Sequence, residues 1–534
     1  MTNEIFDVAV VGYGPTGMVL ASLLGQMGHK VIVLEKWPSL YGRPRLTHMD
    51  GETARLLSFG CDIKDALRDS SPVDSFKFVN AKNQELLDVG AIPTVPMGHP
   101  AHISIHQPDI ETALDRRIRS FPNVTVRQGW EVSGLTQSDQ LVEISVKSAS
   151  KTETVYARYA VGSDGARSIV RETLGIARED FGFNERWLNI DGECKRPLPA
   201  LVRQTRQYCD PARGHMTMPI GHSRQRFEFA VLPNESTESL EAPETAWWIL
   251  KKYHDIGPDD INIIRQIVYT FECRLAKTWR KGRVLLAGDA AHTMPPYLGQ
   301  GACSGIRDSA NLAWKLDLVL RGQTGDQLLD EYERERREHV TYIMKTACSF
   351  GKVANTHSRV AAFFRDLIFK MKLLPPPPPF PAIKTGIVQK SAPGSKASGI
   401  GTVAPQGQIY IGDRKALLDE LTGYRFFLLS QTNPLQQLSA GQRRFLEQLG
   451  CLVLTLGDHD GDGVTRLREP DGHYLEYLRG LNKDAVLLRP DTNVFGFAEK
   501  AADVGSLVDT LRETLKWAEP VARVQPRASE RAHG

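Results

Sequence analysis

The sequence predicts a mixed α/β (α+β) fold, and three observations lead to that prediction. Near the N-terminus a valine-rich apolar run, a glycine-rich turn, a helix-like apolar segment and a second apolar run follow one another. A central region, residues 181–271, contains stretches in which apolar and polar residues alternate, as in antiparallel strands. Five consecutive prolines, residues 375–379, then precede a last part with apolar runs of its own. The 534 residues are enough for two or three domains with separate cores.

The N-terminal segment predicts a βαβ unit of the Rossmann type. Residues 6–11 form the first strand, residues 18–24 lie in the helix, and residues 31–34 form a second strand that ends at Glu35. Between the first strand and the helix lies a G-x-G-x-x-G fingerprint, made by Gly12, Gly14 and Gly17. Its glycines permit a tight turn, approach to a pyrophosphate and close packing of helix on strand. A carboxylate at Glu35 can accept hydrogen bonds from an adenosine ribose, which an incidental glycine turn would not explain.

Two further glycine-rich segments carry carboxylates. Asp164 follows an apolar stretch and precedes a helix, although the segment taken alone could be a simple Asp-Gly turn. Asp289 ends a buried strand, at the edge where ligands bind in open α/β sheets. Residues 295–301 lead into a helix whose N–H groups could face the pyrimidine edge of a reduced flavin, with a rigid structural turn as the alternative. In this order, the three segments are what a site for FAD requires.

Changes in composition along the chain predict its domain organisation. The five prolines exclude a helix or a central strand, so with the Gly/Ser/Lys-rich residues after them they form a spacer. Residues 331–339 are densely charged and are predicted to be an exposed helix. The predicted units are a discontinuous FAD-binding domain (1–180 and 272–372), a substrate-binding antiparallel sheet between its parts (181–271), a linker (373–407), a C-terminal domain (408–520) and a flexible tail (521–534).

The charge, the cysteine spacing and the hydropathy of the sequence limit which binding partners and which cellular location are expected for the protein. The 66 basic and 63 acidic residues nearly balance, which does not favour nucleic acid or an anionic membrane as a partner. The seven cysteines contain no Cys-x-x-Cys pair, so neither a metal site nor a dithiol redox pair is predicted. No segment is apolar for long enough to span a bilayer, and the first strand leaves no room for a signal peptide. We expect a cytoplasmic protein and a homodimer, the commonest closed assembly.

The three glycine-rich segments, in this order, resemble those of the class A flavoprotein aromatic hydroxylases, which are single-component FAD monooxygenases. Within that family the chain is most similar to 3-(3-hydroxyphenyl)propionate hydroxylases and related phenol hydroxylases. The narrower similarity rests on residues 209–211, 226–229, 489–491 and the Asp289 segment. The resemblance covers about residues 5–520. It implies a thioredoxin-like C-terminal domain that lacks a Cys-x-x-Cys pair and serves in packing and subunit contact.

The resemblance also implies which residues hold the cofactor. The fingerprint and Glu35 would bind the ADP half of FAD, and Arg45 and Gln107 would contact the flavin nucleotide. Asp164 would support FAD and the transient NADH or NADPH, and Asp289 would bind the ribityl chain. No second dinucleotide fold is expected, since the nicotinamide nucleotide binds only in passing. The predicted cofactor-binding residues are Gly12, Gly14, Pro15, Thr16, Gly17, Glu35, Lys36, Arg45, Gln107, Asp164, Asp289, Pro296, Gly299, Gln300 and Gly301.

Each acid–base or substrate-binding candidate has a structural alternative. His48 and Asp50 follow the turn at residues 43–45, which we call the arginine turn. Each could accept or relay the proton of a phenol, or be satisfied by the backbone. Tyr297 lies in residues 295–301, the segment predicted to face the flavin. It could donate a hydrogen bond to the substrate or only pack against neighbouring side chains. Arg213 and His215, on the predicted pocket sheet, could meet a substrate carboxylate or lie exposed on a strand.

These inferences predict an FAD-dependent aromatic monooxygenase of catabolism or a related pathway. It would use NADH or NADPH and O₂ to hydroxylate a phenolic ring through a C4a-hydroperoxyflavin. The expected reaction is ortho to an existing hydroxyl, on a substrate like 3-(3-hydroxyphenyl)propionate. His48 and the pair Tyr297 and Leu298 depart from the nearest relatives, which leaves the phenol's identity open. The alternatives are a tailoring hydroxylase of a larger polycyclic or polyketide aromatic, and a non-catalytic flavin-binding regulatory or scaffold protein.

Overall fold

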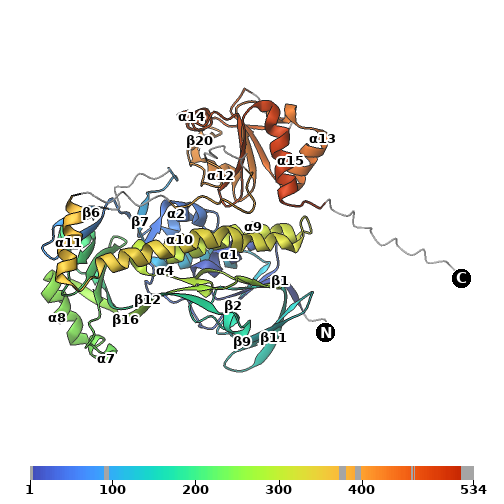
Figure 1. The fold of residues 1–534 in the computed structure, drawn as a ribbon. Helices are drawn as coiled ribbons and strands as arrows, with labels where there is room; N and C mark the ends of the chain where they lie inside the picture. The colour runs from blue at the N-terminus through green and yellow to red at the C-terminus, as the bar shows by residue number, and fades with distance from the viewer. Residues whose placement is uncertain are drawn as a thin grey trace.

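The computed structural model describes residues 4–88, 96–371, 380–390, 399–458, 461 and 463–518. The chain contains both helices and strands, and its strands form several sheets, which confirms the predicted mixed α/β fold. Figure 1 shows the long helices α9 (Gly301–Leu320) and α10 (Asp330–Ala354) across the molecule, with the C-terminal part above them and most of the two large sheets below. The predicted proline run, 375–379, and the predicted flexible tail, 521–534, lie outside the described residues.

A mostly parallel sheet begins with the predicted βαβ unit. Strand β1 (Ile5–Val11) pairs in parallel with β2 (Val31–Glu35) on one side and with β11 (Thr152–Gly162) on the other. Parallel strands are apolar on both faces because other layers cover them, and residues 8–11 and 31–34 are indeed buried. The other strands of this sheet are β8 (Val124–Gln128), β9 (Glu131–Gln137), β10 (Val142–Lys147), β17 (Arg280–Lys281) and β18 (Val284–Leu286).

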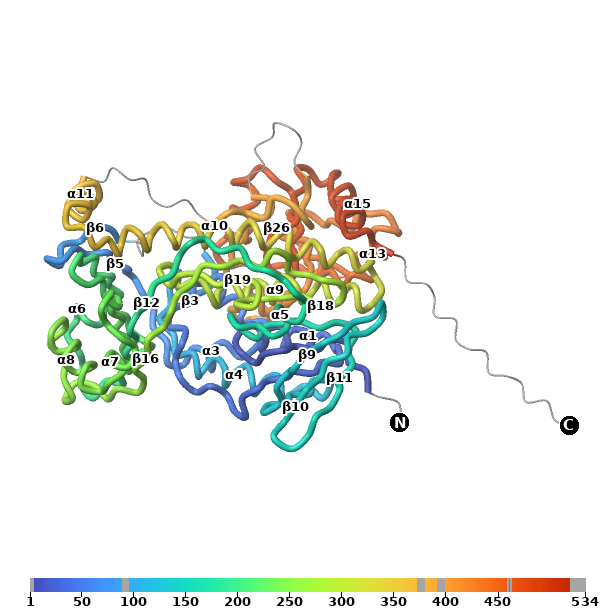
Figure 2. Tube along the Cα trace, turned by 60° about the horizontal axis from the view of Figure 1, so that its bottom comes forward, coloured from blue at the N-terminus to red at the C-terminus, as the bar shows by residue number. Residues whose placement is uncertain are grey.

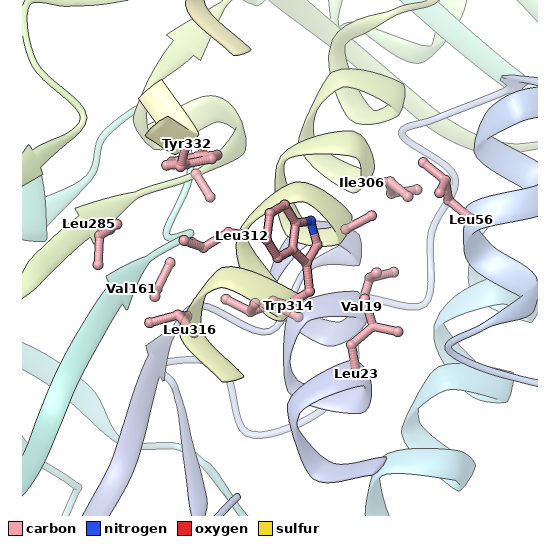
Figure 3. Packing of buried hydrophobic residues seen from close by; sticks show 14 of the residues in the cluster. Val19, Leu23, Leu56, Val161, Leu285, Ile306, Leu312, Trp314, Leu316 and Tyr332 are labelled. Carbon is pink, nitrogen blue, oxygen red and sulfur yellow. The ribbon is translucent and has the colours of Figure 1, made fainter. Parts of the chain in front are cut away.

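Helix α9 is the central helix, since every residue from 303 to 320 is buried. Helices α1 (Pro15–Gln26), α2 (Gly51–Ser58) and α10 pack against it. Figure 3 shows Trp314 of α9 among apolar side chains that include Val19 and Leu23 of α1. The polar residues of α9 that recur at helical spacing, Asp308, Asn311 and Lys315, are buried as well, and all three are hydrogen-bonded to residues of α10. Further helices, labelled in Figure 2, are α3 (Ile63–Ala66), α4 (Gln107–Arg119), α5 (Ile169–Thr173) and α11 (Arg359–Lys370).

The predicted antiparallel region forms the core of a second large sheet. Its long strands β12 (Arg178–Cys194) and β16 (Ile261–Ala276) pair along most of their length. Strands from the N-terminal part, β5 (Phe76–Asn80) and β6 (Glu85–Asp88), extend this sheet beyond residues 181–271. Its other strands are β13 (Thr205–Cys209), β14 (His215–Ile220), β15 (Arg224–Ala230) and β19 (His292–Thr293), and its short helices are α6 (Ala200–Arg203), α7 (Thr237–Leu240) and α8 (Pro243–His254).

The C-terminal part is built on a five-stranded sheet. Phe426 packs edge-on against Trp314 of α9, with ring centroids 5.4 Å apart, so this part shares a core with the central helix. Its thioredoxin-like fold stays a prediction. Its elements are β20 (Gln408–Ile411), β21 (Arg414–Leu417), α12 (Leu418–Thr422), β22 (Phe427–Ser430), α13 (Ala440–Leu449), β23 (Leu452–Thr455), β24 (Thr465–Arg466), α14 (His473–Gly480), β25 (Ala485–Leu488), β26 (Val494–Ala498) and α15 (Val504–Thr514).

The described residues of the predicted linker do not form a detached spacer. The Ile383 amide donates a hydrogen bond to the Gly401 carbonyl at 2.9 Å. The Gln389 amide donates to the Phe495 carbonyl in β26 at 2.7 Å. These segments are therefore hydrogen-bonded to one another and to the C-terminal sheet, which the Pro/Gly-rich composition of residues 373–407 did not indicate.

The prediction of an exposed helix at residues 331–339 is wrong for part of that segment. Glu335, Arg336 and His339 are buried. Glu335 accepts hydrogen bonds from Arg489 Nη2 at 2.7 Å and from Lys315 Nζ at 2.8 Å. The C-terminal part covers this side of α10 and supplies the partner arginine, which the local charge pattern could not reveal. Among the described helices, none has both the length and the apolar character needed to cross a membrane.

Candidate functional site

The glycine fingerprint builds a turn in which two positions tolerate no side chain. Gly12 has φ +104°, and a Cβ there would lie 2.5 Å from the Ser163 carbonyl oxygen. A Cβ on Gly17 would lie 2.2 Å from the carbonyl oxygen of Gly12, so the start of α1 packs directly on the turn. No atom lies within 4 Å of a Cβ built on Gly14, and Gly14 lines an open cavity. The turn therefore leaves backbone accessible where a pyrophosphate is predicted.

Glu35 is fixed by the chain around the turn. Its carboxylate accepts hydrogen bonds from the amides of Tyr13 at 2.8 Å and Trp37 at 2.9 Å. It lines the same cavity as Pro15, Thr16 and Lys36. We call these four residues, with Gly12, Gly14, Asp164 and Asp289, the nucleotide cradle. Its helix terminus and carboxylates are the groups that bind phosphate and ribose in dinucleotide sites.

The other two predicted carboxylates face the cavity from different strand ends. Asp164 Oδ1 is buried and has no hydrogen-bond partner among the described residues, while Oδ2 accepts from the Val170 amide at 3.2 Å. Burial raises the pKa of Asp164. Asp289 opens onto the cavity, where the surrounding protein raises its pKa and nearby His292 and Arg45 act in the opposite direction. Both carboxylates thus lack full compensation and are available to hydrogen-bond donors of a ligand.

Gln107 holds the arginine turn rather than extending freely into the cavity. Its Oε1 accepts hydrogen bonds from the amides of Arg45 at 3.0 Å and Leu46 at 2.7 Å. Its Nε2 donates to Glu111 at 2.6 Å. The Arg45 guanidinium lies 3.8 Å from the centre of the Tyr41 ring, and both Arg45 and Gln107 line the cavity. Gln107 therefore positions Arg45, which is predicted to contact the flavin.

The segment before α9 contributes the remaining predicted flavin contacts. Pro296, Gly299, Gln300 and Gly301 all line the cavity. Gly299 has φ +62°, and no described side chain caps the first turn of α9. The free N–H groups and the positive end of the helix dipole therefore face the cavity, where they can stabilise negative charge on a ligand.

Asp50 is occupied by structural partners. It caps α2 by accepting from the Thr53 amide at 2.8 Å, and it also accepts from Arg307 at 2.6 Å and Gln300 at 2.8 Å. Burial would raise the pKa of Asp50, but Arg307 and the hydrogen bonds outweigh burial and hold the pKa below its usual range. The geometry favours a role in positioning Gln300 rather than in accepting a proton. The sequence analysis did not single out Arg307, which no local motif marked.

His48 lies at the cavity next to a second imidazole. In the small sheet of β3 (His48–Asp50), β4 (Ser71–Pro72) and β7 (His102–Ser104), His48 Nε2 lies 3.1 Å from His102 Nδ1. His48 Nδ1 is buried without a partner among the described residues. Burial, and then His102, lower the pKa of His48 to about 4, so the ring is neutral at pH 7. His102, which the sequence analysis missed, reaches His48 only through the pairing of β3 with β7.

The second sheet has one apolar face and one face toward the cavity. Across β12, β15 and β14, Asn189 pairs with Glu228 and Glu228 with Met216, while Arg226 pairs with Asp191 and Met218. Directly opposed residues share a face, so these side chains form two adjacent rows. We call this face the sheet wall; its members are Asn189, Asp191, Met216, Met218, Arg226, Glu228 and Arg265. All of them line the cavity except Asp191, which accepts hydrogen bonds from Arg226.

Arg213 and His215 lie elsewhere. His215 pairs with Phe229 on the opposite face, stacks on Tyr208 with ring centroids 4.3 Å apart, and is buried. Arg213 is buried and paired with Glu235. Neither is among the described residues that line the cavity, so the geometry does not support their predicted contact with substrate. A shift of one residue along a strand exchanges the two faces, and the cavity-facing neighbour is Met216.

Tyr297 also points away from the cavity. Its hydroxyl donates to Glu185 at 2.6 Å, and its ring packs edge-on against Phe183 and Trp187. It is 3% exposed, whereas the neighbouring Pro296 and Leu298 line the cavity. Of the two alternatives for Tyr297, the contacts therefore favour packing.

Charged groups in the sheet wall hold the arginine turn. Arg226 donates to Asp191 through Nε at 2.6 Å and Nη2 at 2.9 Å. The same guanidinium donates to the carbonyl of Arg45 at 2.7 Å and that of Pro44 at 3.0 Å. Arg265 Nη1 also donates to the Pro44 carbonyl and lies 3.5 Å from Asp191. The wall and the turn that carries Arg45 are thus one hydrogen-bonded unit.

The nucleotide cradle and the sheet wall line one cavity of about 2300 Å³. Hydrogen-bond donors, carboxylates and a glycine turn with accessible backbone are the groups that bind a dinucleotide such as FAD. The described residues that line the cavity supply all three, so they fit that cofactor. The cavity continues past the cradle to an aromatic and methionine-lined region that includes Phe76, Met216 and Met218. Such a region suits an aromatic ring.

Comparison with known families and proteins agrees with this geometry. Residues 6–347 match the FAD binding domain family, and residues 401–514 match the HcaD C-terminal domain family. The chain is 34% identical to a probable NADH-specific resorcinol 4-hydroxylase from Rhodococcus jostii (strain RHA1), over 95% of each chain. It is 32% identical to a 3-(3-hydroxy-phenyl)propionate/3-hydroxycinnamic acid hydroxylase from Escherichia coli (strain K12), over 98% of this chain and 97% of the relative.

Solved structures share the fold. An aklavinone-11 hydroxylase, solved with FAD and aklavinone, superposes with a TM-score of 0.77 at 23% identity, covering 97% of this chain and all of that chain. An anhydrotetracycline hydroxylase from Streptomyces rimosus superposes with a TM-score of 0.74 at 22% identity, over 95% of this chain and 99% of that chain. At these identities the similarity concerns the fold alone.

Proposed function

Because the chain belongs to the single-component (class A) FAD-dependent aromatic hydroxylases, we propose that it hydroxylates a small neutral phenol, ortho to an existing hydroxyl group, with NADH and O₂. One observation carries this proposal: the nucleotide cradle and the sheet wall line the same cavity. A ring bound against the wall can therefore meet a flavin bound in the cradle without leaving the protein.

The residues of the cradle have distinct proposed roles around FAD. Gly14 and the start of α1 would face the pyrophosphate, Glu35 the adenosine ribose, and Asp289 the ribityl chain. Arg45, held by Gln107, and the N-terminal end of α9 would face the isoalloxazine. Bound FAD supplies the redox chemistry, accepting hydride from the nicotinamide and activating O₂. The protein's part is to orient the ring and keep water out.

The charges of the sheet wall support a neutral substrate. The wall contains two arginines and two acids, and Arg226 and Arg265 both lie against Asp191. The charges sum to zero when Glu228 is ionised, so the wall offers no net positive charge to a substrate carboxylate. A dihydroxybenzene such as resorcinol, the substrate in the name of one relative, fits this wall better than a phenylpropionate. Position 4 of resorcinol is ortho to one hydroxyl, in agreement with the expected regiochemistry.

The test is oxidation of NADH and NADPH by the purified flavoprotein with resorcinol, phenol and 3-(3-hydroxyphenyl)propionate, with product masses. We expect resorcinol to stimulate NADH oxidation most and to yield a product heavier by one oxygen. A higher kcat/KM for the propionate would overturn the neutral-substrate proposal while retaining the hydroxylase. No oxygenated product from any phenol would overturn the phenol hydroxylase itself and favour a larger aromatic or a non-catalytic role.

A further inference from the structure

Glu228 is the carboxyl group of the sheet wall that lines the cavity, whereas Asp191 does not line it. It lies in β15 between Asn189 of β12 and Met216 of β14, and all three line the cavity. Glu228 is only 4% exposed. A carboxyl group in such a position is desolvated by its neighbours, yet it borders the space that a bound ring would fill.

Glu228 is incompletely paired, in contrast to Asp191 one row away. Its Oε1 accepts a hydrogen bond from Asn189 Nδ2 at 3.2 Å and lies 3.8 Å from Arg226 Nη1. Arg226, however, directs its hydrogen bonds to Asp191 and to the arginine turn. Asp191 therefore has a bidentate partner, whereas Glu228 has one amide donor among the residues that the structure describes. A buried carboxylate with so little compensation gains free energy by accepting a proton.

The other predicted acid–base groups are less available. Asp50 is held by Arg307, Gln300 and the Thr53 amide. Both nitrogens of His48 are engaged or covered, since Nε2 contacts His102 and Nδ1 is buried. Burial raises the pKa of Glu228, Arg226 and Arg265 lower it, and Asp191 raises it, which makes Glu228 a better proton acceptor than an exposed glutamate. The charged and titratable groups around it are Asp191, Arg226, Arg265 and Tyr297.

We propose that Glu228 is the catalytic residue that accepts the proton of the substrate's phenolic hydroxyl; this rests on the proposed function. The phenolic O–H bond breaks, its electron pair stays on the phenolic oxygen, and the proton forms a new O–H bond with the Glu228 carboxylate. Because the phenolic oxygen now carries a negative charge, the ring is electron-rich at the stage when an electrophilic oxygen attacks it. When the product regains its aromatic ring, the attacked carbon releases its proton to solvent and the electron pair of that C–H bond returns to the ring. Glu228 then gives its proton back to the phenolic oxygen and is a carboxylate again. No further oxidant or reductant is needed for this step.

The first readout is proton uptake on binding, without turnover. The oxidised, FAD-loaded protein is titrated with 4-nitrophenol at a pH where the probe is ionised in solution. If Glu228 and the bound phenolic oxygen share a proton, binding takes up about one proton per site. We expect Glu228→Gln to abolish this uptake, because the amide keeps an acceptor for Asn189 but takes no proton. Glu228→Asp should retain it, and Glu193→Gln, at the exposed end of β12, is the matched control.

The second readout is turnover with phenols of different acidity. Glu228→Gln should lower product formation from the unsubstituted phenol by roughly 100-fold or more, in the range of general-base catalysis. Ring-fluorinated phenols, which lose their proton more readily, should recover most of that loss. A variant that only disturbs packing would lose activity equally with all of these substrates. Flavin content and Tm are measured for each variant to confirm that it folds.

Two outcomes would overturn the proposal. One is proton uptake in Glu228→Gln equal to that of the wild type and of Glu193→Gln. The other is a loss of turnover that does not depend on the acidity of the phenol. Failure of the proposed function is distinguishable, because wild-type protein would then oxygenate no phenol. In that case the binding titration would still show whether Glu228 shares a proton with the oxygen of a bound phenol.

Discussion

The nucleotide cradle and the sheet wall face one cavity but are built by different means. The turn of the cradle is made of backbone, with glycine where a Cβ would collide with neighbouring main-chain atoms, as at Gly12 and at Gly17 just after it. The wall is made of side chains from strands that are far apart in sequence, such as Asn189, Glu228 and Arg265. The cradle therefore depends on conformation, and the wall on register and on the balance of buried charges.

This difference predicts the largest effect for a substitution in the cradle turn. Gly12→Ala should abolish the folded flavoprotein, because a side chain at φ +104° is strained and its Cβ would lie 2.5 Å from the Ser163 carbonyl. We expect a loss of about 3 kcal/mol or more, measured as Tm and as flavin per protein. Gly14→Ala is the control, since Gly14 has φ −87° and open space around its Cβ. That variant should fold normally and bind FAD about tenfold more weakly; unchanged affinity would contradict a pyrophosphate above Gly14.

In the wall, the largest effect is expected from Arg226→Met. This change leaves the buried Asp191 with only the more distant Arg265, and it releases the carbonyls of the arginine turn. Breaking such a pair costs about 3–5 kcal/mol, which urea denaturation would measure. The double variant Arg226→Met with Asp191→Asn should regain part of that loss, because the uncompensated charge is gone. If the single and double variants were equally stable, the uncompensated charge of Asp191 would not be the cause of the lost stability.

Buried charge also joins α10 to the C-terminal part, and here pH is the probe. Burial alone would raise the pKa of Glu335, but Arg489 and Lys315 lower it from 4.5 to about 2. A lowered folded-state pKa stabilises the protein above the unfolded value, so this contribution, about 3 kcal/mol, is lost as pH falls from about 4.5 to 2. The free energy of unfolding should fall over that window. Glu335→Gln should be less stable at pH 7 and lose less stability on acidification; an unchanged acid transition would contradict this assignment.

The smallest predicted effects come from two neighbouring residues of β14 that lie on opposite faces of the sheet. Met216→Ala should change KM for the phenol about fivefold, because Met216 lines the cavity and removing its side chain costs contacts worth roughly 1 kcal/mol. His215→Ala, one residue away on the apolar face, should lower Tm and leave KM within about twofold. Steady-state kinetics and thermal unfolding measure both. A larger KM effect for His215 than for Met216 would reverse the assignment of the faces.

These two faces show why the substrate-binding candidates could not be read from the sequence. Arg213 and His215 have the right chemistry, and His215 begins strand β14, but alternation along the strand turns His215 toward Tyr208 and Phe229. Arg226 and Glu228 alternate with Phe227 and Phe229, and the sequence alone did not say which pair faces a ligand. The choice depends on what covers each face, here α8 on one side and the cavity on the other.

The sequence by itself determined the βαβ unit, the order of the three glycine-rich segments and the family, because these depend on local backbone geometry and short spacings. Around the cavity, Gly12, Glu35, Asp164 and Asp289 are all close to strand ends that the sequence predicted. Only the tertiary structure decided that Arg307 donates a hydrogen bond to Asp50, that Glu335 is buried against Arg489, and that Glu228 lines the cavity. Each of these pairs residues that are distant in sequence, and only packing determines which charges lose their water and which partners compensate them.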